Sequence, residues 1–403
     1  MEQAIQPKDF VRQLQDELDA IAAWWLEHVV CLEQGTIAGE VSDHNHPEPS
    51  AEKSLVYVAR LLWFFSAANR NRPSQRYREA ANICYRELTS RFPDQENGGM
   101  VWSVDTAGHP VSRKKQCYGM SFAVYALTEY ALTENTMSCA NETAMHQAAE
   151  LVSVIETRMH DSLHGGYIEA MTADWQPLDD VRLGESDLNA DKTMNTHLHV
   201  LEAWINVHRA MPGRDSAHRL ACLIELFLER FVTDDGYLKR FFTLDWREIP
   251  TAASYGHDIE ASWLLWEAAT VLGDENIRDR VQAPVITLAE SVLTNGTGDD
   301  GGVIHEGTTA GPHDANRIWW VQAEALVGFM NAWRITGDDR YLQASWNSWA
   351  FIREHQRDRE YGEWNWFSRL DASTTPTYKA GFWKAPYHNG RAILETLRRL
   401  SQR

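Results

Sequence analysis

Ionisable and amide side chains interrupt several otherwise apolar stretches of this sequence. Asn195 and His199 lie four residues apart in NTHLH, and His257 and Glu260 lie three apart in GHDIEA. Residues three or four apart share one face of a helix, so each pair can point into a common cavity. Three more such residues stand alone in apolar segments: Arg60, Glu324 and His388. Because an ionisable group is costly to bury unless it faces a wet cavity, these positions indicate a polar site.

Two of the histidines follow short turn sequences, SYG before His257 and PY before His388, which predicts that both lie at helix N-termini. The positive end of a helix dipole disfavours the imidazolium form, so both side chains should be neutral at pH 7. A neutral imidazole can act as a general base. A capping or core role is the commoner one for a single histidine, but several on neighbouring helices favour acid–base chemistry.

Two histidine pairs have a spacing that could suggest a metal site, and neither is a convincing one. His197 and His199 are two residues apart, which places them on nearly opposite faces of a helix, so they cannot share one ion. His44 and His46 lie in the turn sequence DHNHPEP, where a solvated loop is the simpler interpretation. We therefore predict no metal site and no cofactor.

The elements that carry these residues follow an internal repeat. A short glycine turn, usually followed by aromatic or β-branched residues, occurs six times, with spacings of 59, 67, 71, 65 and 61 residues, at Gly39, Gly98, Gly165, Gly236, Gly301 and Gly362. Most units hold one amphipathic and one largely apolar helical pattern. The amphipathic set covers residues 8–30, 74–91, 142–160, 214–231, 275–293 and 339–356; the apolar set covers 54–70, 120–132, 194–209, 257–273, 318–337 and 387–400.

Twelve helices that alternate between an outer and an inner set predict an all-α fold, the (α/α)6 barrel, with short β-hairpins in the loops. An open array of helical pairs would need polar caps at both ends, so a closed ring is favoured. No Pro/Ser-rich linker interrupts the chain, and we expect a single catalytic domain over residues 1–403. The longest non-helical segment, residues 171–193, is a candidate lid.

Composition narrows the range of partners. The 403 residues include 38 basic and 57 acidic side chains, a net charge of −19, which argues against nucleic acid. The sequence has no apolar run of 18 residues and no export leader, so neither membrane insertion nor secretion is predicted. Five scattered cysteines without a C-x-x-C pair fit free thiols in the cytoplasm. A monomer and a homodimer are both compatible with the sequence.

Aromatic residues are dense near the candidate site. Among the 17 tryptophans, several lie with Tyr387 in the last two units: Trp319, Trp320, Trp364, Trp366 and Trp383. Flat apolar rings suit the C–H faces of sugars, although core packing is the alternative for each. We expect Trp320 and Trp383 to contact a sugar.

Six longer segments carry a resemblance to a known family. In chain order they are ARLLWFFSAANR, DKTMNTHLHVLEAW, SYGHDIEASWLL, WWVQAEALVGF, GEWNWF and WKAPYHNGR. In these segments, over nearly its full length, the chain resembles the N-acylglucosamine 2-epimerase superfamily. The resemblance implies an (α/α)6 barrel and cofactor-free epimerisation at C2 of a reducing-end sugar, glucose to mannose, in β-1,4-linked disaccharides.

The same resemblance implies roles for the residues that match family motifs. His257 and His388 would be the two acid–base catalysts, which exchange a proton with C2 through a planar cis-enediolate. Arg60 and His199 would stabilise the enediolate oxygens. The remaining matches would bind or stack on the substrate, or assist ring opening, Glu260 by orienting His257; they are Asn195, Asp187, Tyr118, Glu260, Trp320, Trp383 and Glu324.

Three departures from the family pattern affect the walls beside the sugar. Val321 replaces the proline of WWPQAEA, Ala385 replaces the cysteine of WKCPYHN, and residues 118–122 read YGMSF in place of Y-x-Q-A-F. None of them removes a proposed acid or base. The choice between a disaccharide and a free hexose therefore stays open.

Three other functions remain open at this point. An aldose–ketose isomerase acting on free hexoses would need only one relocated acid. An inverting glycoside hydrolase would need two carboxylates about 6.5–9.5 Å apart, which Glu260, Glu324 and Asp187 could supply. A non-catalytic sugar-binding protein would not need paired neutral bases. Imidazoles in the inner helices favour the epimerase.

Overall fold

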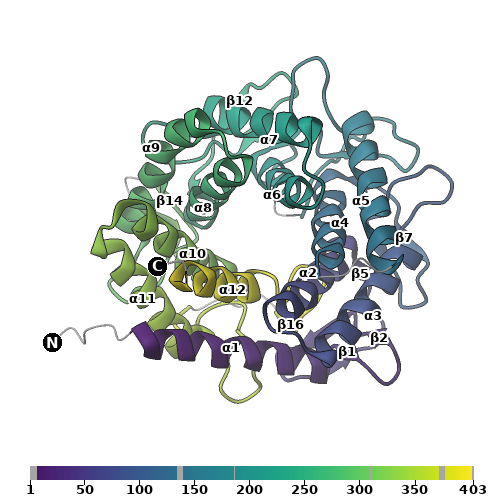
Figure 1. The fold of residues 1–403 in the computed structure, drawn as a ribbon, viewed down its shortest axis with the longest axis horizontal. Coiled ribbons are helices and arrows are strands. Elements are labelled where there is room, and N and C mark those ends of the chain that lie inside the picture. Colours follow the sequence, from purple (N-terminus) through teal and green to yellow (C-terminus); the bar gives the residue numbers. More distant parts are fainter. Residues whose placement is uncertain (1–6, 134–138, 186, 309–310, 372–376, 402–403) are drawn as a thin grey trace.

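Inner and outer helices alternate around a closed ring in the computed structural model, which describes residues 7–133, 139–185, 187–308, 311–371 and 377–401 (Figure 1). The inner ring consists of α2 (Leu55–Asn71), α4 (Cys117–Ala131), α6 (Met194–Ala210), α8 (Tyr255–Leu272), α10 (Trp319–Thr336) and α12 (His388–Ser401). The outer ring consists of α1 (Pro7–His28), α3 (Gln75–Arg91), α5 (Cys139–Arg158), α7 (Arg214–Leu226), α9 (Glu275–Ser291) and α11 (Asp339–Phe351). The predicted (α/α)6 barrel is confirmed.

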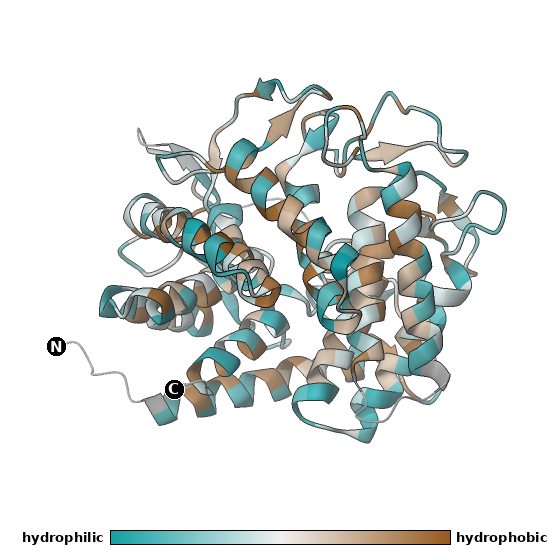
Figure 2. Ribbon diagram, turned by 45° about the horizontal axis from the view of Figure 1, so that its top comes forward, coloured by the Kyte–Doolittle hydropathy of each residue, from teal (hydrophilic) through white to brown (hydrophobic). Residues whose placement is uncertain are grey.

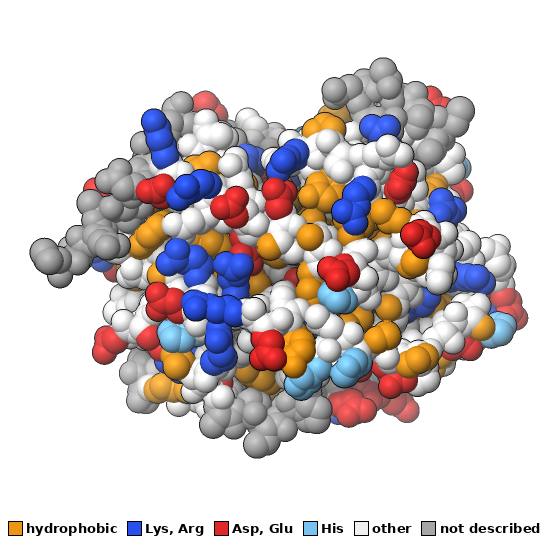
Figure 3. Space-filling model, turned by 90° about the horizontal axis from the view of Figure 1, so that it is seen from below, with side chains coloured by type: hydrophobic (Ala, Val, Ile, Leu, Met, Phe, Trp, Pro, Cys, Tyr) orange, Lys and Arg blue, Asp and Glu red, His pale blue; other side chains and the backbone are white. Residues whose placement is uncertain are grey.

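Burial explains the difference between the two rings. Every residue of α4 is buried, whereas α3 buries only residues spaced by one to four positions along one face: Ala80, Ala81, Ile83, Cys84 and Leu88. The hydrophobic core includes buried residues of both the inner and the outer helices. Apolar (brown) and polar (teal) residues are interspersed along the helices (Figure 2). Acidic and basic side chains are interspersed over the outer face that includes α1 (Figure 3).

The helix ends differ slightly from the predicted ones. Three outer helices continue into a single π-helical turn, namely η1 (Phe227–Phe231), η2 (Val292–Gly296) and η3 (Ile352–Gln356), which accounts for the longer helical patterns in the sequence. The first amphipathic pattern runs to residue 30, but α1 ends at His28 because Val30 already pairs with Ile37 in a strand. None of the described helices is long and apolar enough to cross a membrane.

Short antiparallel strands connect neighbouring units around the ring. The sheets are β1 (Val30–Cys31) with β2 (Thr36–Ile37); β16 (Tyr378–Ala380), β3 (Glu40–Ser42) and β4 (Pro47–Glu48); β5 (Lys53–Ser54), β6 (Ser103–Val104) and β7 (Pro110–Ser112); β8 (Lys115–Gln116) and β9 (Ala170–Met171); β10 (Lys192–Thr193), β11 (Phe241–Phe242) and β12 (Glu248–Ile249); and β13 (Ala253–Ser254), β14 (Glu306–Thr308) and β15 (Gly311–Asp314). The strand before an inner helix pairs with the hairpin of the next unit, as β5 does with β6.

The same kind of pairing closes the ring between its last and first units. Strand β16 pairs with β3, and the side-chain amide of Asn45 donates to the carbonyl oxygen of Tyr361 at 2.8 Å. The indole Nε1 of Trp25 on α1 donates to Glu363 at 2.7 Å, across 338 positions of sequence. These contacts make the barrel a closed toroid rather than an open array.

The predicted glycine turns recur with a further feature that the sequence did not reveal. In three units, an aspartate at the start of the turn binds a buried lysine that precedes an inner helix: Asp94 with Lys115 at 2.6 Å, Asp161 with Lys192 at 2.7 Å and Asp358 with Lys379 at 2.8 Å. Lys115 and Lys192 stand two residues before α4 and α6, so their ion pairs tie these turns to the starts of inner helices, at the end of the barrel that carries the polar residues. Lys379 ties its turn to strand β16.

Candidate active site

A cavity of about 840 Å³ opens at this end of the barrel, around the N-terminal parts of inner helices and the adjoining hairpins. It contains most of the residues that the sequence singled out. The predicted residues in its wall are Arg60, Tyr118, Asp187, Asn195, His199, His257, Glu260, Trp320, Trp383 and His388. Side chains from α2, α4, α6, α8, α10 and α12 therefore converge on one space, although they are spread over more than 300 positions of sequence.

His257 lies in the first turn of α8, with its ring partly exposed to the cavity. Its Nδ1 is 2.8 Å from Oγ of Ser254, which leaves Nε2 for a substrate. Burial, followed by the charge of Arg240, holds the pKa of His257 well below its usual value. The expected neutral form is therefore supported, with burial as the main cause. The expected orientation of His257 by Glu260 is wrong, because Ser254 is the partner.

His388 is the first residue of α12 and is buried. Its Nδ1 is 2.7 Å from Oε1 of Glu324, so Nε2 is again the nitrogen left for the cavity. Burial first, and then the charges of Arg60 and Arg391, lower the pKa of His388 well below the usual value. Both catalytic candidates are thus neutral imidazoles anchored through Nδ1.

Trp320 brings the two imidazoles into one place. The centroid of its ring lies 4.8 Å from that of His257 and 5.7 Å from that of His388. The two histidines come from helices that are separated by 131 positions in sequence. Their common contact with one tryptophan puts two potential proton-transfer groups beside the same part of the cavity.

Arg60 and His199 form a polar part of the wall next to these histidines. Arg60 donates to the Tyr118 hydroxyl at 2.9 Å and to the Trp383 carbonyl oxygen at 3.0 Å, and its Nε has no partner among the described residues. His199 Nδ1 is 2.9 Å from Glu202 Oε2. The side-chain oxygen of Asn195 is also buried without a partner in the described part of the chain. Unfilled hydrogen-bonding groups of this kind suit a polar ligand.

The family model of N-acylglucosamine 2-epimerase (GlcNAc 2-epimerase) matches residues 38–392 of this chain. The chain belongs to this family. A cellobiose 2-epimerase from Bacteroides fragilis is 41% identical over 390 residues, which covers 96% of this chain and 98% of that protein. A D-mannose isomerase from Marinomonas mediterranea is 21% identical over 87% of each chain.

Solved structures give the same result for the fold. The structure of cellobiose 2-epimerase from Spirochaeta thermophila DSM 6192 superposes with a TM-score of 0.90 at 37% sequence identity. The match covers 98% of this chain and 97% of that one. Family membership and the closed barrel therefore agree over nearly the whole chain.

Glu324 is the one predicted substrate-binding residue that does not line the cavity. It lies one helical turn below Trp320 on α10 and is fully buried. Its Oε1 faces His388 and accepts from Arg391 at 2.6 Å, and its Oε2 accepts from the indole of Trp263 at 3.0 Å. Glu324 therefore contacts His388 on the side away from the cavity and does not itself line the cavity.

The buried layer under the cavity contains two groups that the sequence analysis missed, Glu202 and Arg391. Arg391 contacts three carboxylates: Glu202 through Nη1, Glu260 at 2.5 Å and Glu324 at 2.6 Å through Nη2. Burial would raise the pKa of Glu202, but the charge of Arg391 and the hydrogen bond from His199 hold it at about 2. The sequence carried a signal for Glu202, which interrupts an apolar helical segment in the same way as Arg60. Arg391 follows His388, Asn389 and Gly390 at the polar start of its helix, so it does not stand out.

Glu260, Glu324 and His388 have ligand atoms close enough together to hold a metal ion. The Arg391 guanidinium already bridges the two carboxylates, so it supplies the positive charge that a cation would bring.

His197 faces away from the cavity, as its spacing from His199 predicts. Its Nδ1 faces the Thr193 carbonyl oxygen at 2.6 Å and its Nε2 accepts from the Tyr167 amide at 2.8 Å.

The outer part of the cavity wall contains further residues that the sequence did not single out. Arg240 forms an ion pair with Glu306 at 2.6 Å, and His305 Nδ1 is 2.9 Å from Asp314 Oδ2. All four line the cavity. Loop residues 183, 184, 187 and 188 also contribute to its wall, so part of the predicted lid does border the site. Movement of that loop stays a prediction.

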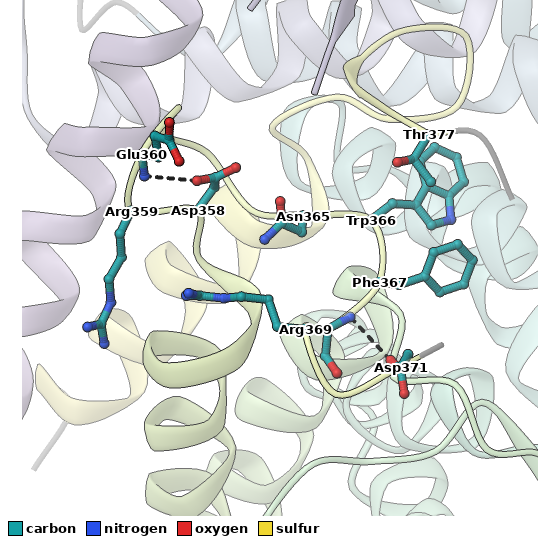
Figure 4. Close-up of a pocket in the computed structure, with 10 residues that line it drawn as sticks. Asp358, Arg359, Glu360, Asn365, Trp366, Phe367, Arg369, Asp371 and Thr377 are labelled. Atoms are coloured by element: carbon teal, nitrogen blue, oxygen red, sulfur yellow. Dashed lines mark hydrogen bonds between the residues drawn. The ribbon is translucent and has the colours of Figure 1, made fainter. Parts of the chain in front are cut away.

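A second cavity of about 770 Å³ lies beside the segment 358–371 (Figure 4). Its two aspartates accept hydrogen bonds from backbone amides of their own turns: Asp358 from the Glu360 amide at 2.9 Å, and Asp371 from the Ser368 amide at 3.2 Å. Trp366 borders both cavities, but none of the predicted acid–base residues lines the second one. The candidate active site is therefore the cavity around Trp320.

Proposed function

We propose that this chain is a cellobiose 2-epimerase, a cofactor-independent isomerase that interconverts glucose and mannose at the reducing end of β-1,4-linked disaccharides. The observation that carries the proposal is the pair His257 and His388, two neutral imidazoles anchored through Nδ1 against one tryptophan. Epimerisation at C2 needs one group to remove a proton and another to return one to the opposite face. Two imidazoles from different helices meet that requirement.

In this mechanism, one imidazole removes the C2 proton through Nε2, and the electron pair moves into a cis-enediolate. The other imidazole, which has taken a proton from solvent on Nε2, then delivers that proton to the opposite face of C2, and the first imidazole releases its proton to solvent. The roles exchange in the reverse direction. Arg60, held by Tyr118 and the Trp383 carbonyl oxygen, and His199, held by Glu202, stabilise the negative charge on the enediolate oxygens. No atom changes its net oxidation state over the whole reaction.

Ring opening must come before proton removal, because the C2 proton becomes acidic only beside a free carbonyl group. Glu260 lines the cavity, and burial, followed by the charge of Glu324, raises its pKa. A carboxyl group that keeps its proton can donate it to the ring oxygen, while the anomeric hydroxyl loses its own proton to solvent and the carboxylate is reprotonated from solvent. We assign this step to Glu260. Asp187 from the segment before β10 and Asn195 from the first turn of α6 bind substrate hydroxyl groups.

The volume of the cavity favours a disaccharide over a single hexose. Its volume lies towards the upper end of the range of about 300–1,000 Å³ that is usual for small-molecule sites. Trp383 would stack on the reducing sugar and Trp320 on the second sugar. The chain would act as one catalytic domain in the cytoplasm, and the four cysteines that the structure describes as free thiols fit that compartment.

Incubation of the purified protein with cellobiose, and separately with mannose, tests the proposal. Glucosyl-mannose from cellobiose is the expected product. Fructose from mannose, with no reaction of cellobiose, would favour the aldose–ketose isomerase instead. Release of free glucose from cellobiose would indicate glycoside hydrolysis and would contradict both isomerase functions.

A further inference from the structure

Arg391 connects two of the three histidines proposed to act on the substrate, His199 and His388, through their carboxylate partners. Its Nη1 contacts Glu202, whose other oxygen faces His199 Nδ1 at 2.9 Å. Its Nη2 donates to Glu324, whose Oε1 also faces His388 Nδ1 at 2.7 Å. The guanidinium itself is fully buried and does not line the cavity. One side chain therefore contacts both of the carboxylates that anchor these imidazoles.

The hydrogen bonds around Glu324 indicate its charge state. Oε1 accepts from Arg391 and lies against His388 Nδ1, while Oε2 accepts from Trp263. The N–H groups of Arg391 and Trp263 both point at this carboxyl group and favour its ionised form. An ionised Glu324 can pair with His388 only if Nδ1 of His388 carries the proton. The same reasoning applies to Glu202, which also accepts the Tyr387 hydroxyl. Both histidines then present an unprotonated Nε2.

Arg391 is needed for this arrangement because three carboxylates meet at one place. Buried carboxylates without a counter-ion take up protons, since charge is costly in a medium of low polarity. Arg391 is the described cation in direct contact with Glu202, Glu260 and Glu324, and its ring contacts with Tyr387 and Trp263 keep its plane fixed. If Glu324 took up a proton, it would donate to Nδ1, and the proton of His388 would move to Nε2.

We propose that Arg391 is a positioning residue that keeps His388 and His199 in the Nδ1-protonated tautomer, so that both present Nε2 to the substrate. The proposal rests on the proposed function for its catalytic consequence, but the tautomers themselves can be observed without substrate. His257 is outside this control because its Nδ1 faces Ser254. Arg391 thus affects two of the three imidazoles proposed to act on the substrate.

The test uses Arg391→Lys, which retains a positive charge and removes the two-armed guanidinium. The matched control is Arg399→Lys. Arg399 lies two turns further along α12, is buried and also packs on Trp263, but its partners are Glu267, Glu395 and Asn331. Both variants lose a buried arginine of one helix, and only the first loses the contacts below the cavity.

Nitrogen-15 NMR of the histidine side chains, without substrate, reports which ring nitrogen carries the proton. In Arg391→Lys, we expect the signals of both His388 and His199 to leave the Nδ1-protonated position, with His257 unchanged and with kcat about 100-fold lower at a KM within about threefold. Arg399→Lys should leave all three histidines and kcat as in the wild type. Unchanged tautomers in Arg391→Lys, or an equal change in both variants, would overturn the proposal.

Glu202→Gln provides an independent check if Arg391→Lys does not fold. The amide removes the charge next to His199 and leaves Glu324 and His388 in place. If the guanidinium couples the two anchors, the nitrogen signals of His388 shift in this variant as well. No shift at His388 would overturn the proposed coupling. If the wild-type protein does not act on cellobiose but the tautomers change in Arg391→Lys, the proposed function is wrong and the positioning role of Arg391 still holds.

Discussion

Oε1 of Glu324 lies 2.7 Å from Nδ1 of His388, although the two residues are 64 positions apart and Glu324 does not reach the cavity. Any effect of this carboxylate on a substrate would therefore pass through the imidazole that it contacts.

Glu324→Gln tests this relationship. The side-chain amide is nearly the same size as the carboxylate, but it has one oxygen where the carboxylate has two. If its NH2 group faces His388 Nδ1, that end of the side chain can no longer accept from Arg391, so we expect a mixture of the two His388 tautomers. We expect kcat to fall about 10- to 100-fold with little change in KM, whereas His388→Ala abolishes turnover. Glu267→Gln is the control, because Glu267 is a buried carboxylate on α8 at the end of that helix away from the cavity. A wild-type kcat in Glu324→Gln would show that the carboxylate does not set the function of His388.

The hydroxyl of Ser254 has the same relationship to His257. Ser254→Ala removes the contact at 2.8 Å and should lower kcat about three- to tenfold, because the ring keeps its packing against Trp320 and loses only its orientation. Ser262→Ala is the matched control, since that buried hydroxyl on α8 donates to the Ile259 carbonyl oxygen and does not line the cavity. Equal kinetics of the two variants would contradict the role given to Ser254.

The two tryptophans at the cavity should affect different kinetic constants. Trp383→Ala removes a stacking surface and should raise KM about tenfold, a loss of about 1.4 kcal/mol in binding. Trp320→Ala should lower kcat as well, because Trp320 contacts both His257 and His388. Steady-state kinetics with cellobiose measures both effects. Trp266→Ala, on α8 but outside the cavity wall, should change neither constant.

The lowered pKa values of His257 and His388 predict the shape of the pH profile. A base whose pKa is lowered stays unprotonated below the ordinary histidine pKa of about 6.5. Arg240 and His305 face His257, and Arg60 and Arg391 face His388, and all of these groups act in the lowering direction. Activity should therefore persist as the pH falls below 6.5 and be lost only at a lower pH. Loss of half the kcat/KM at or above pH 6.5 would be inconsistent with these environments.

His197 should matter for stability and not for chemistry. Its two nitrogens bind the Thr193 carbonyl oxygen and the Tyr167 amide, and burial lowers its pKa to about 4. His197→Phe leaves the Tyr167 N–H unpaired, which should cost about 1–3 kcal/mol of unfolding free energy, with kcat retained. His199→Asn should show the opposite pattern. Thermal melts and kinetics of both variants measure the difference.

The pKa of His197 also fixes a direction for stability against pH. The folded-state value is below the unfolded value of about 6.5, so the folded chain binds fewer protons there. Its contribution to stability is complete above pH 6.5 and is lost as the pH falls from 6.5 towards 4. In His197→Phe, unfolding by acid should therefore become less steep over that interval, and an unchanged slope would argue against the buried neutral form.

The fold could be predicted almost completely from local patterns. Each helix repeats an apolar period, and the glycine turns mark the units, with a positive φ of 75° at Gly98 and 77° at Gly165. The ion pairs between Asp94 and Lys115 and their counterparts could not be predicted, because which turn meets which helix start depends on the packing of the ring.

The sequence predicted most of the residues that line the cavity, but not the buried residues that lie beneath it. Periodicity along one helix shows which residues share a face, but it does not show how deep each residue lies in the barrel. Glu324 shares a face with Trp320 and lies one turn deeper, so its prediction as a substrate ligand was wrong. Arg391 was overlooked because it stands near the polar end of a terminal helix. Depth follows only once six helices are assembled.

Proton NMR of cellobiose incubated with the purified protein in D2O tests the central claim most directly. If His257 and His388 exchange the C2 proton through an enediolate, deuterium appears at C2 of the reducing sugar together with a new glucosyl-mannose anomeric signal. His257→Ala and His388→Ala should abolish formation of the new signal while their melting curves stay close to that of the wild type. Conversion of cellobiose to glucosyl-mannose without deuterium at C2 would contradict the proposed mechanism.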